Sequence, residues 1–252
     1  YGVTRLVNMA HGALFMLGTY IFWFLTETDF RGLPYEPIGL DLGLALILTV
    51  ILTGIVGVIL YRLIMHPVID DMLAVLTATV GLLIIMQELL FIEFGARRWR
   101  IVPLMEGYTA IWGVKVFNSQ LLAFAVSLCL FAGLWIFIAK IKIGKAMRAV
   151  AQDREVAMLM GVNVERVYML TMGISAAFAA IAGVLIISST TGLADPYIWD
   201  RPLYISFAIV ILGGLGSVKG SLVGAFIVGY AETGVAYFIP QGGYLQGAVA
   251  LG

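Results

Sequence analysis

Six long apolar runs limit what this chain can fold into more than any other feature of its sequence. A helix of about 20 apolar residues crosses the hydrocarbon core of a bilayer, and a helix pairs its backbone polar groups internally, as lipid requires. We therefore predict six membrane-spanning helices, at about residues 9–26, 40–65, 73–94, 116–139, 167–190 and 219–238.

Two further apolar segments are shorter. The run LYISFAIVIL at 203–212 has about half the crossing length and is followed directly by GGLGSVKG. We predict that it is either a short span or a broken, re-entrant helix. An eighth span is predicted to begin near Gln241. The predicted fold class is therefore an all-α, polytopic membrane protein, a helical bundle of about 7–8 transmembrane segments.

Both ends of the sequence are typical of a piece of a longer protein. It begins with YGVTRLVN, without an initiator methionine, and it stops within the apolar run QGGYLQGAVALG. We expect residues 1–252 to be a single transmembrane domain that is truncated at both ends, with a helix missing from each end.

Composition excludes several classes of function. The chain is 62% hydrophobic and 12% charged, with a mean hydropathy of +1.02, whereas water-soluble domains are about one quarter charged. The formal net charge is zero, so nucleic-acid binding is not expected. Cys129 is the single cysteine, which excludes an internal disulfide, and we expect it to be buried. His11 and His66 have no partners at metal-ligand spacing, so no metal and no cofactor is predicted.

The basic residues favour one orientation in the membrane. Cytoplasmic loops are richer in Lys and Arg than external loops, and placing residues 140–166 in the cytoplasm gives nine basic residues on that side and six on the other. The loops at 27–41 and 95–115 are predicted to lie at the membrane surface, although the second is unusually basic. The nine are Arg5, Arg62, Lys140, Lys142, Lys145, Arg148, Arg154, Arg166 and Lys219, and the six are Arg31, Arg97, Arg98, Arg100, Lys115 and Arg201.

Two of the predicted spans carry small residues at four-residue spacing. Such residues let helix backbones approach closely in lipid, where packing drives association. We predict that these two helices lie in the middle of the bundle, with a pore-lining role as the alternative. The residues are Ser175, Ala179 and Gly183 in one span, and Gly220, Gly224, Ala225 and Gly229 in the other.

Residues 142–162 form a polar, helix-forming stretch in a chain that is otherwise apolar. Short side chains recur every four positions and are predicted to lie along one side of a helix, flanked by charged groups and by apolar residues that would anchor it. One interpretation is a docking surface for a partner, and the other is an amphipathic helix on lipid headgroups. The short residues are Ala149, Asp153, Ala157 and Gly161, the charged ones Arg148, Arg154 and Glu155, and the apolar ones Val150, Met158 and Leu159.

A few polar groups fall within the predicted spans or at their ends. A charge in hydrocarbon is costly, so Glu88 and Glu232 either are protonated, pair with polar neighbours or face a water-filled path. Asn8, His11 and Gly12 stand where a span begins. They are either structural or shape an unwound helix start near a pore.

The glycine-rich segment after residue 212 does not match a nucleotide-binding loop. A P-loop needs Lys after its final Gly, but here Lys219 precedes Gly220. The spacing of the glycines also departs from the dinucleotide-binding pattern. We predict that Gly213 and Gly214 make a tight turn after the short 203–212 helix, and that the end of this helix helps to line a path.

Three stretches, in this order, resemble a known family. NMAHGALFMLGTY at 8–20, GKAMRAVAQDREVAMLMGVNVERV at 144–167 and GGLGSVKGSLVGAFIVG at 213–229 are similar to signature stretches of the branched-chain amino acid ABC transporter permeases. Within the second, EVAMLMG from Glu155 to Gly161 resembles the EAA loop of ABC importer permeases, with Val156 where a second alanine is usual.

The resemblance implies a multi-pass subunit of the bacterial inner membrane, without catalytic residues or cofactors, that works by ATP-driven alternating access. Its implied partners are two ABC ATPase subunits, a second permease subunit, a periplasmic substrate-binding protein, the lipid bilayer and an amino-acid substrate that is branched-chain or otherwise hydrophobic. Residues 142–162 would be the cytoplasmic coupling helix. Its docking surface would comprise Asp153, Arg154, Glu155, Ala157 and Gly161.

Other functions are weighed against this one. A permease for urea or short amides resembles the same family. An intramembrane enzyme needs a catalytic pair or metal motif within the spans, and the sequence offers no such set, so an enzyme is not predicted. An ungated channel would leave the 142–162 stretch without a role.

Overall fold

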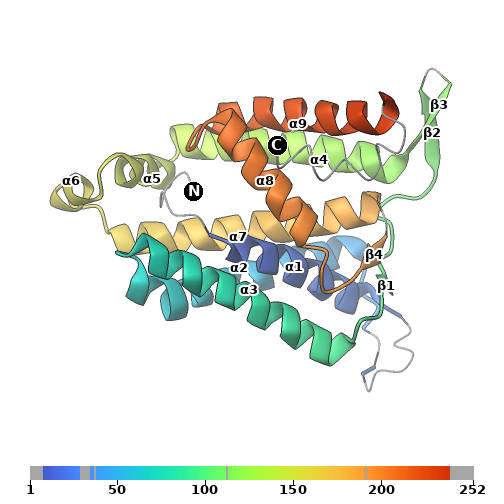
Figure 1. Cartoon of the computed structure of the whole chain (residues 1–252), viewed down its shortest axis with the longest axis horizontal. Coiled ribbons are helices and arrows are strands. Elements are labelled where there is room, and N and C mark those ends of the chain that lie inside the picture. The colour runs from blue at the N-terminus through green and yellow to red at the C-terminus, as the bar shows by residue number, and fades with distance from the viewer. Residues whose placement is uncertain (1–7, 29–34, 37, 112, 191, 239–252) are drawn as a thin grey trace.

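The computed structural model describes residues 8–28, 35–36, 38–111, 113–190 and 192–238. Within these residues the chain is a bundle of long helices that run roughly along one axis, with short helices at one end and short strands at the other (Figure 1). The predicted all-α class of membrane protein is confirmed. The predicted span near Gln241 and the basic residues Arg5 and Arg31 lie outside the described residues.

Each predicted span corresponds to a long helix. Among the described residues, five helices are long and apolar enough to cross a membrane, when the second is counted as continuing to Val68, and α1 is a shorter apolar helix of 17 residues. The short predicted segment is α8 (Asp200–Gly213), whose 14 residues extend about 21 Å. The long helices are α1 (Ala10–Thr26), α2 (Leu42–Leu60), α3 (Met72–Phe94), α4 (Asn118–Lys140), α7 (Val164–Ser189) and α9 (Val218–Phe238).

The remaining elements lie at the two ends of the bundle (Figure 1). At one end, α2 continues into the π-helix η1 (Tyr61–Met65) and the 3-10 turn η2 (His66–Val68), and α5 (Lys142–Gln152) and α6 (Arg154–Leu159) join α4 to α7. At the opposite end, β1 (Trp99–Arg100) pairs with β4 (Leu193–Ala194), and β2 (Tyr108–Ile111) pairs with β3 (Val114–Phe117), both antiparallel. The polar 142–162 stretch and the 95–115 loop thus lie at opposite ends.

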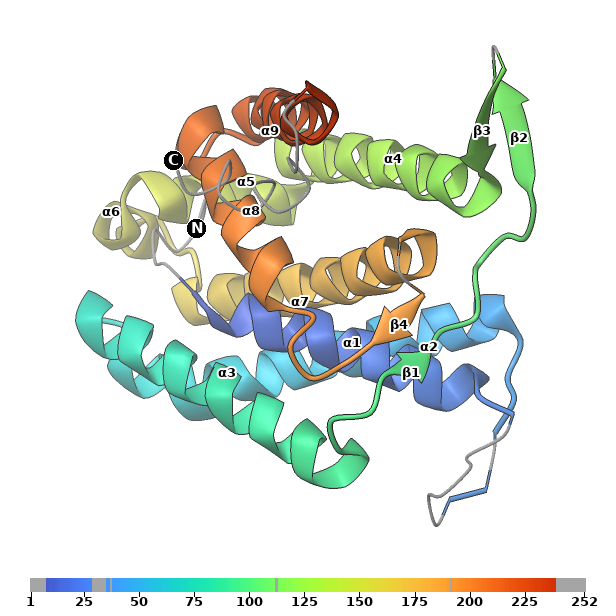
Figure 2. The same cartoon turned by 45° about the vertical axis from the view of Figure 1, so that its right-hand side comes forward.

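Three helices, α1, α2 and α7, pack closely on one another, and we call them the central triplet (Figure 2). Thirteen of the 17 residues of α1 are buried. A Cβ atom added to Gly57 of α2 would lie within 3.0 Å of the Ala176 side chain of α7, and one added to Gly18 of α1 would meet the backbone of Ala180 as closely. Glycine and alanine at these crossings let the backbones touch. Gly183 packs against α1 in the same way, as predicted.

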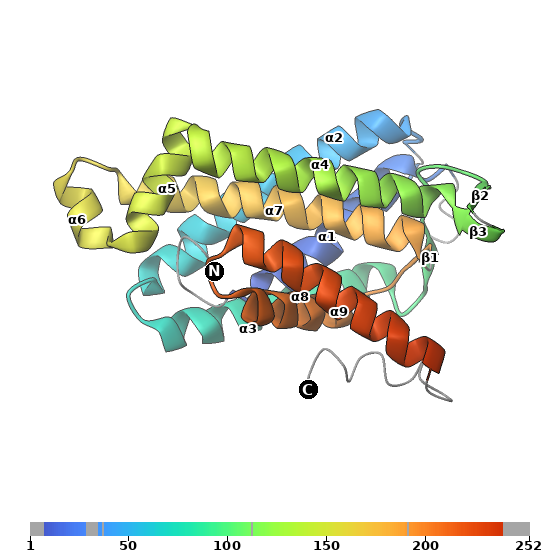
Figure 3. The same cartoon turned by 90° about the horizontal axis from the view of Figure 1, so that it is seen from above.

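We call α4, α8 and α9 the peripheral group, because they cover one side of the central triplet loosely (Figures 2 and 3). Among their described residues, α4 buries Ser119 and α8 buries Leu203, and α9 buries two residues. Gly220 and Gly224 meet the backbone of α8 closely, but the prediction that the helix carrying them lies in the middle of the bundle is wrong, since α9 lies at its periphery. Outside its own helix, no atom of the described residues lies within 4 Å of a Cβ added to Gly229. Cys129 on α4 was expected to be buried but is exposed.

Candidate functional site

Residues 142–162 form two helices, which corrects the prediction of a single coupling helix. The break is at Asp153, whose backbone is extended (φ −153°, ψ 113°). Its carboxylate oxygen Oδ1 accepts a hydrogen bond from the Val156 amide at 3.0 Å, and a side chain that caps a helix in this way favours a helix start. Ala149 and Ala157 therefore belong to different helices and do not share one face.

The predicted docking residues on α6 have different surroundings. Asp153 and Glu155 are exposed, but Ala157 is only 3% exposed and packs into the chain's own hydrophobic cluster. Gly161 follows α6 with φ +82°, and its amide bonds to the Met158 carbonyl while the Val162 amide bonds to that of Ala157. This is the glycine-dependent end of a helix. Ala157 is thus buried beneath α6, whereas Gly161 is exposed and ends the helix.

The outer surface of α6 is apolar. Leu159 is 86% exposed and Met160 is 79% exposed, and Val156 is also exposed. We call these three residues the α6 tip. Met158 and Leu159 were predicted to anchor the stretch against the bundle, but both are exposed, and the anchoring is done by Val150. The missed signal was a run of large apolar residues in an otherwise polar segment.

Arg154 connects α6 to the rest of the bundle. Its Nη1 atom bonds to Oδ1 of Asp70, which lies in the connection between η2 and α3. Its guanidinium also lies over the ring of Tyr168 on α7, 5.9 Å from the centroid. The hydrogen bond that this guanidinium donates to Asp70 raises the pKa of Arg154 above its ordinary value.

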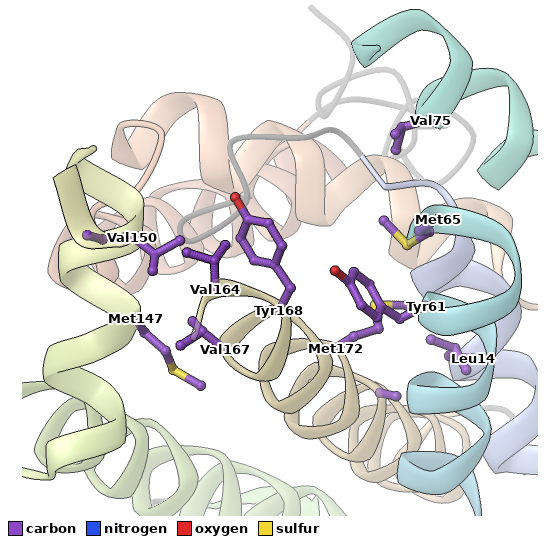
Figure 4. Packing of buried hydrophobic residues seen from close by; sticks show 12 residues of the cluster. Leu14, Tyr61, Met65, Val75, Met147, Val150, Val164, Val167, Tyr168 and Met172 are labelled. Atoms are coloured by element: carbon purple, nitrogen blue, oxygen red, sulfur yellow. The ribbon is translucent and has the colours of Figure 1, made fainter. Parts of the chain in front are cut away.

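A buried apolar cluster lies beneath this ion pair (Figure 4). Met147 and Val150 of α5 contribute to it together with Val164, Val167 and Tyr168 of α7 and Tyr61 and Met65 of η1. Single π-helical turns are frequent at functional positions, and this one joins α2 to the connection that Asp70 occupies. The helix pair is thus packed onto α7 and bonded to the α2–α3 connection.

The predicted residues at the start of α1 have both local and distant contacts, since Nδ2 of Asn8 also lies within hydrogen-bond distance of the sulfur atoms of Met65 and Met172. The Asn8 side chain accepts a hydrogen bond from the Ala10 amide at 2.9 Å, and Nδ1 of His11 lies 3.3 Å from the Asn8 carbonyl oxygen. Gly12 is buried where α1 meets Leu83 of α3 and Trp199, the residue before α8. These residues set the start of α1 and its contact with α8.

Polar groups gather where α8 begins. The indole Nε1 of Trp199 donates to Oε1 of Gln87 on α3 at 2.7 Å, and Gln87 in turn contacts the exposed Glu88. Beside them, Nη2 of Arg201 lies 3.4 Å from Oε1 of Glu232 on α9. Arg201 was not among the predicted site residues, because it was counted with an external loop.

Gly213 and Gly214 lie at the other end of α8. Gly213 touches the backbone of Gly220, and Gly214 has φ +89°, so the predicted tight turn is confirmed. The structure therefore brings Gly12 and the neighbours of Glu88 to one end of α8, and it puts this glycine pair at the opposite end.

The chain was compared with known proteins. Residues 1–251 match the family described as branched-chain amino acid transport system permease component. The chain is 29% identical over 243 residues to the high-affinity branched-chain amino acid transport system permease protein LivH of Escherichia coli K12, and 30% identical over 239 residues to the corresponding protein BraD of Pseudomonas aeruginosa. Both alignments cover 92% of this chain and 77% of the relative.

A shorter similarity reaches a sugar transporter. The xylose transport system permease protein XylH of Escherichia coli K12 is 33% identical over 99 residues, which are 37% of this chain and 25% of that protein. No solved structure matches the chain. Since the family match spans nearly every residue and the similarity to LivH and BraD runs along the whole bundle, this chain belongs to the branched-chain amino acid transport permease family, and it is a transport component rather than an enzyme.

Proposed function

We propose that this chain moves branched-chain or other hydrophobic amino acids across a bacterial inner membrane by ATP-driven alternating access. LivH and BraD carry branched-chain amino acid transport in their names, which supports this substrate class over urea or short amides. In this proposal residues 1–252 are one transmembrane permease domain, and α5 and α6 together are its cytoplasmic coupling element.

The observation that carries the proposal is the apolar α6 tip. It projects beyond the ends of the long helices (Figure 1), next to exposed charged residues such as Asp153 and Glu155. Exposed apolar side chains gathered outside the membrane region are typical of a protein interface. An ATPase subunit with an apolar groove would take up this tip, and the charges around it would set the register.

Two contacts would transmit motion of α6 into the bundle. The Arg154–Asp70 ion pair joins α6 to the α2–α3 connection, and the buried cluster with Met147 and Val150 joins α5 to α7. An ATPase shifts the equilibrium between two permease conformations only if it binds one of them better. Through these two contacts the two permease conformations would hold the α6 tip in different positions. The ATPase would then bind the tip better in one conformation than in the other.

The remaining surfaces support the other partners of this proposal. The peripheral group buries few of its apolar residues, which suits both lipid and a second permease subunit. The β2–β3 hairpin extends from the end opposite α6 (Figure 1), where a substrate-binding protein would dock. In this arrangement the two soluble partners act on opposite ends of the chain.

Co-purification tests the coupling. In the full-length protein expressed with its transporter partners, the L159Q/M160Q variant should lose the ATPase at wild-type levels of membrane insertion, because it removes the apolar side chains of the tip. K145Q, a change at an exposed position of α5, is the matched control and should retain the ATPase. ATP hydrolysis by the eluate is the readout. Retention of the ATPase by L159Q/M160Q would refute α6 as the docking element.

A further inference from the structure

The ion pair between Arg201 and Glu232 lies within the helical bundle. Glu232 is the fifteenth of the 21 residues of α9, and its side chain is only 15% exposed. Arg201 stands in the first turn of α8, next to Trp199, which bonds to Gln87 within the α3 span. Charged groups at such positions are costly in lipid and mark substrate pathways or relays.

Helix stability does not explain why an arginine stands here. The N-terminus of a helix carries partial positive charge, so an anion is favoured there and a cation is not. Asp200 already supplies the acidic residue of this first turn. The Arg201 guanidinium is also 52% exposed, and its 3.4 Å contact with Glu232 is long for a charge-assisted hydrogen bond. The pair is therefore loose and accessible on its arginine side.

We propose that Arg201 and Glu232 form a subsite for the charged backbone of a zwitterionic amino acid during its passage, an inference that rests on the function proposed above. The substrate carboxylate binds the Arg201 guanidinium, which suits carboxylates in a two-bond geometry. The substrate ammonium binds the Glu232 carboxylate.

Charge balance supports this exchange. In the empty site the two side chains neutralise each other, and in the occupied site each pairs with the opposite charge of the substrate. Neither state leaves a lone charge in the bundle, which would be strongly unfavourable. A neutral amide such as urea has no charges to exchange, so the same pair also explains a preference for amino acids.

The competing role is a structural clamp between α8 and α9. Both roles predict that R201Q and E232Q fail, because each removes one member of the ion pair, and R201Q leaves the largely buried Glu232 carboxylate without that counter-charge. The R201Q/E232Q double variant separates them, since a clamp without charges no longer carries that penalty, whereas a subsite without charges cannot hold the zwitterion. R98Q is the matched control, because Arg98 forms a similarly long ion pair with Asp195, at 3.5 Å, at the strand end of the molecule.

The experiment is leucine uptake into proteoliposomes that contain the complete transporter, together with the melting temperature of each complex. We expect R201Q/E232Q to keep its melting temperature and its bound ATPase. Its uptake should fall about tenfold or more, because the substrate loses its hydrogen bonds to two charged side chains. R98Q should transport normally. Wild-type uptake by R201Q/E232Q would overturn the subsite.

A second pair of variants keeps the test decisive if the double variant does not assemble. R201K and E232D retain both charges, so a clamp should tolerate them, whereas a subsite should lose uptake at unchanged melting temperature. Normal uptake by both would overturn the subsite. A wild-type complex that hydrolyses ATP without taking up leucine would instead refute the proposed substrate, which is a separate failure.

Discussion

The central triplet and the peripheral group differ in how much of each helix the chain itself covers. The most apolar stretch of α7 is 39% buried, whereas the corresponding stretch of α4 is 0% buried and that of α9 is 11% buried. Small residues such as Gly57 and Ala176 let the helices of the triplet pack directly on one another. The peripheral group depends on lipid and on partners for its packing. The corresponding stretch of α2 is 22% buried, so the triplet is the more closely packed part of the chain without being covered on every side, and the peripheral group is the more exposed part.

The proposed functional groups follow this division. Arg154 and Asp70 lie at the end of the bundle where the core meets α6. Arg201 and Glu232 lie between two helices of the peripheral group. A closely packed core next to α6 and a loosely packed group that carries the charged pair would suit the proposed alternating access, because loosely packed helices can rearrange without opening the core.

The largest effect is expected for a change that opens the core. Gly57→Leu would force a side chain into Ala176, and overpacking of this kind costs about 3 kcal/mol. We expect a large fall in the melting temperature of the purified complex. Gly133→Leu on α4 of the peripheral group is the control, since outside its own helix no atom of the described residues lies within 4 Å of its added Cβ. Equal melting temperatures for the two variants would remove the distinction between core and periphery.

A smaller effect is expected at the crossing of α8 and α9. Gly220→Ala places a Cβ against the Gly213 backbone and should cost about 1–2 kcal/mol. Because it separates the helices that carry Arg201 and Glu232, uptake should fall more than the melting temperature does. Gly229→Ala on the same helix is the control, because its added Cβ meets no atom of the described residues outside this helix within 4 Å. Unchanged uptake in Gly220→Ala would mean that this crossing does not position the ion pair.

A several-fold effect is expected for the bond between α6 and the α2–α3 connection. Asp70→Asn weakens the ion pair with Arg154, and exposed pairs of this kind contribute little to stability. Uptake should fall roughly two- to fivefold while the ATPase stays bound. Glu165→Gln, which alters the longer 3.9 Å contact with His66, should have no effect. Loss of the ATPase from Asp70→Asn would show that Asp70 supports docking rather than transmission.

The smallest effect is expected at the end of α6. Gly161→Ala forces an L side chain into the left-handed region and should destabilise this helix end by about 1 kcal/mol. Faster amide hydrogen exchange in α6 would report it. Gly161→Asn, which tolerates this conformation better, should exchange at nearly the wild-type rate. The reverse order would contradict the glycine-capped helix end.

The long helices were predictable because a span depends on a local property, the length of an apolar run. The break at Asp153 was harder, since strong helix formers surround it and the outcome depends on one capping carboxylate. The direction of Leu159 depends on how α6 packs on the bundle. This packing is a tertiary feature, which the periodicity of the sequence does not reveal.

The candidate site was predictable in part. Glu232 was recognisable as a charge within an apolar span, but its partner Arg201 lies 31 positions away at the edge of a short apolar run. Arg201 was interpreted as part of a loop because α8, with 14 residues, is too short for a predicted span. Pairs of this kind depend on how helices are arranged, so sequence patterns found one member and missed the other.

The most direct test of the central claim is ATP-dependent leucine uptake into proteoliposomes, measured for the wild-type complex and for L159Q/M160Q. The account predicts uptake that needs ATP in the wild type and is absent in the variant, at equal amounts of reconstituted permease. Uptake that proceeds without ATP, or that is equal in the two complexes, would contradict a permease driven through the α6 tip.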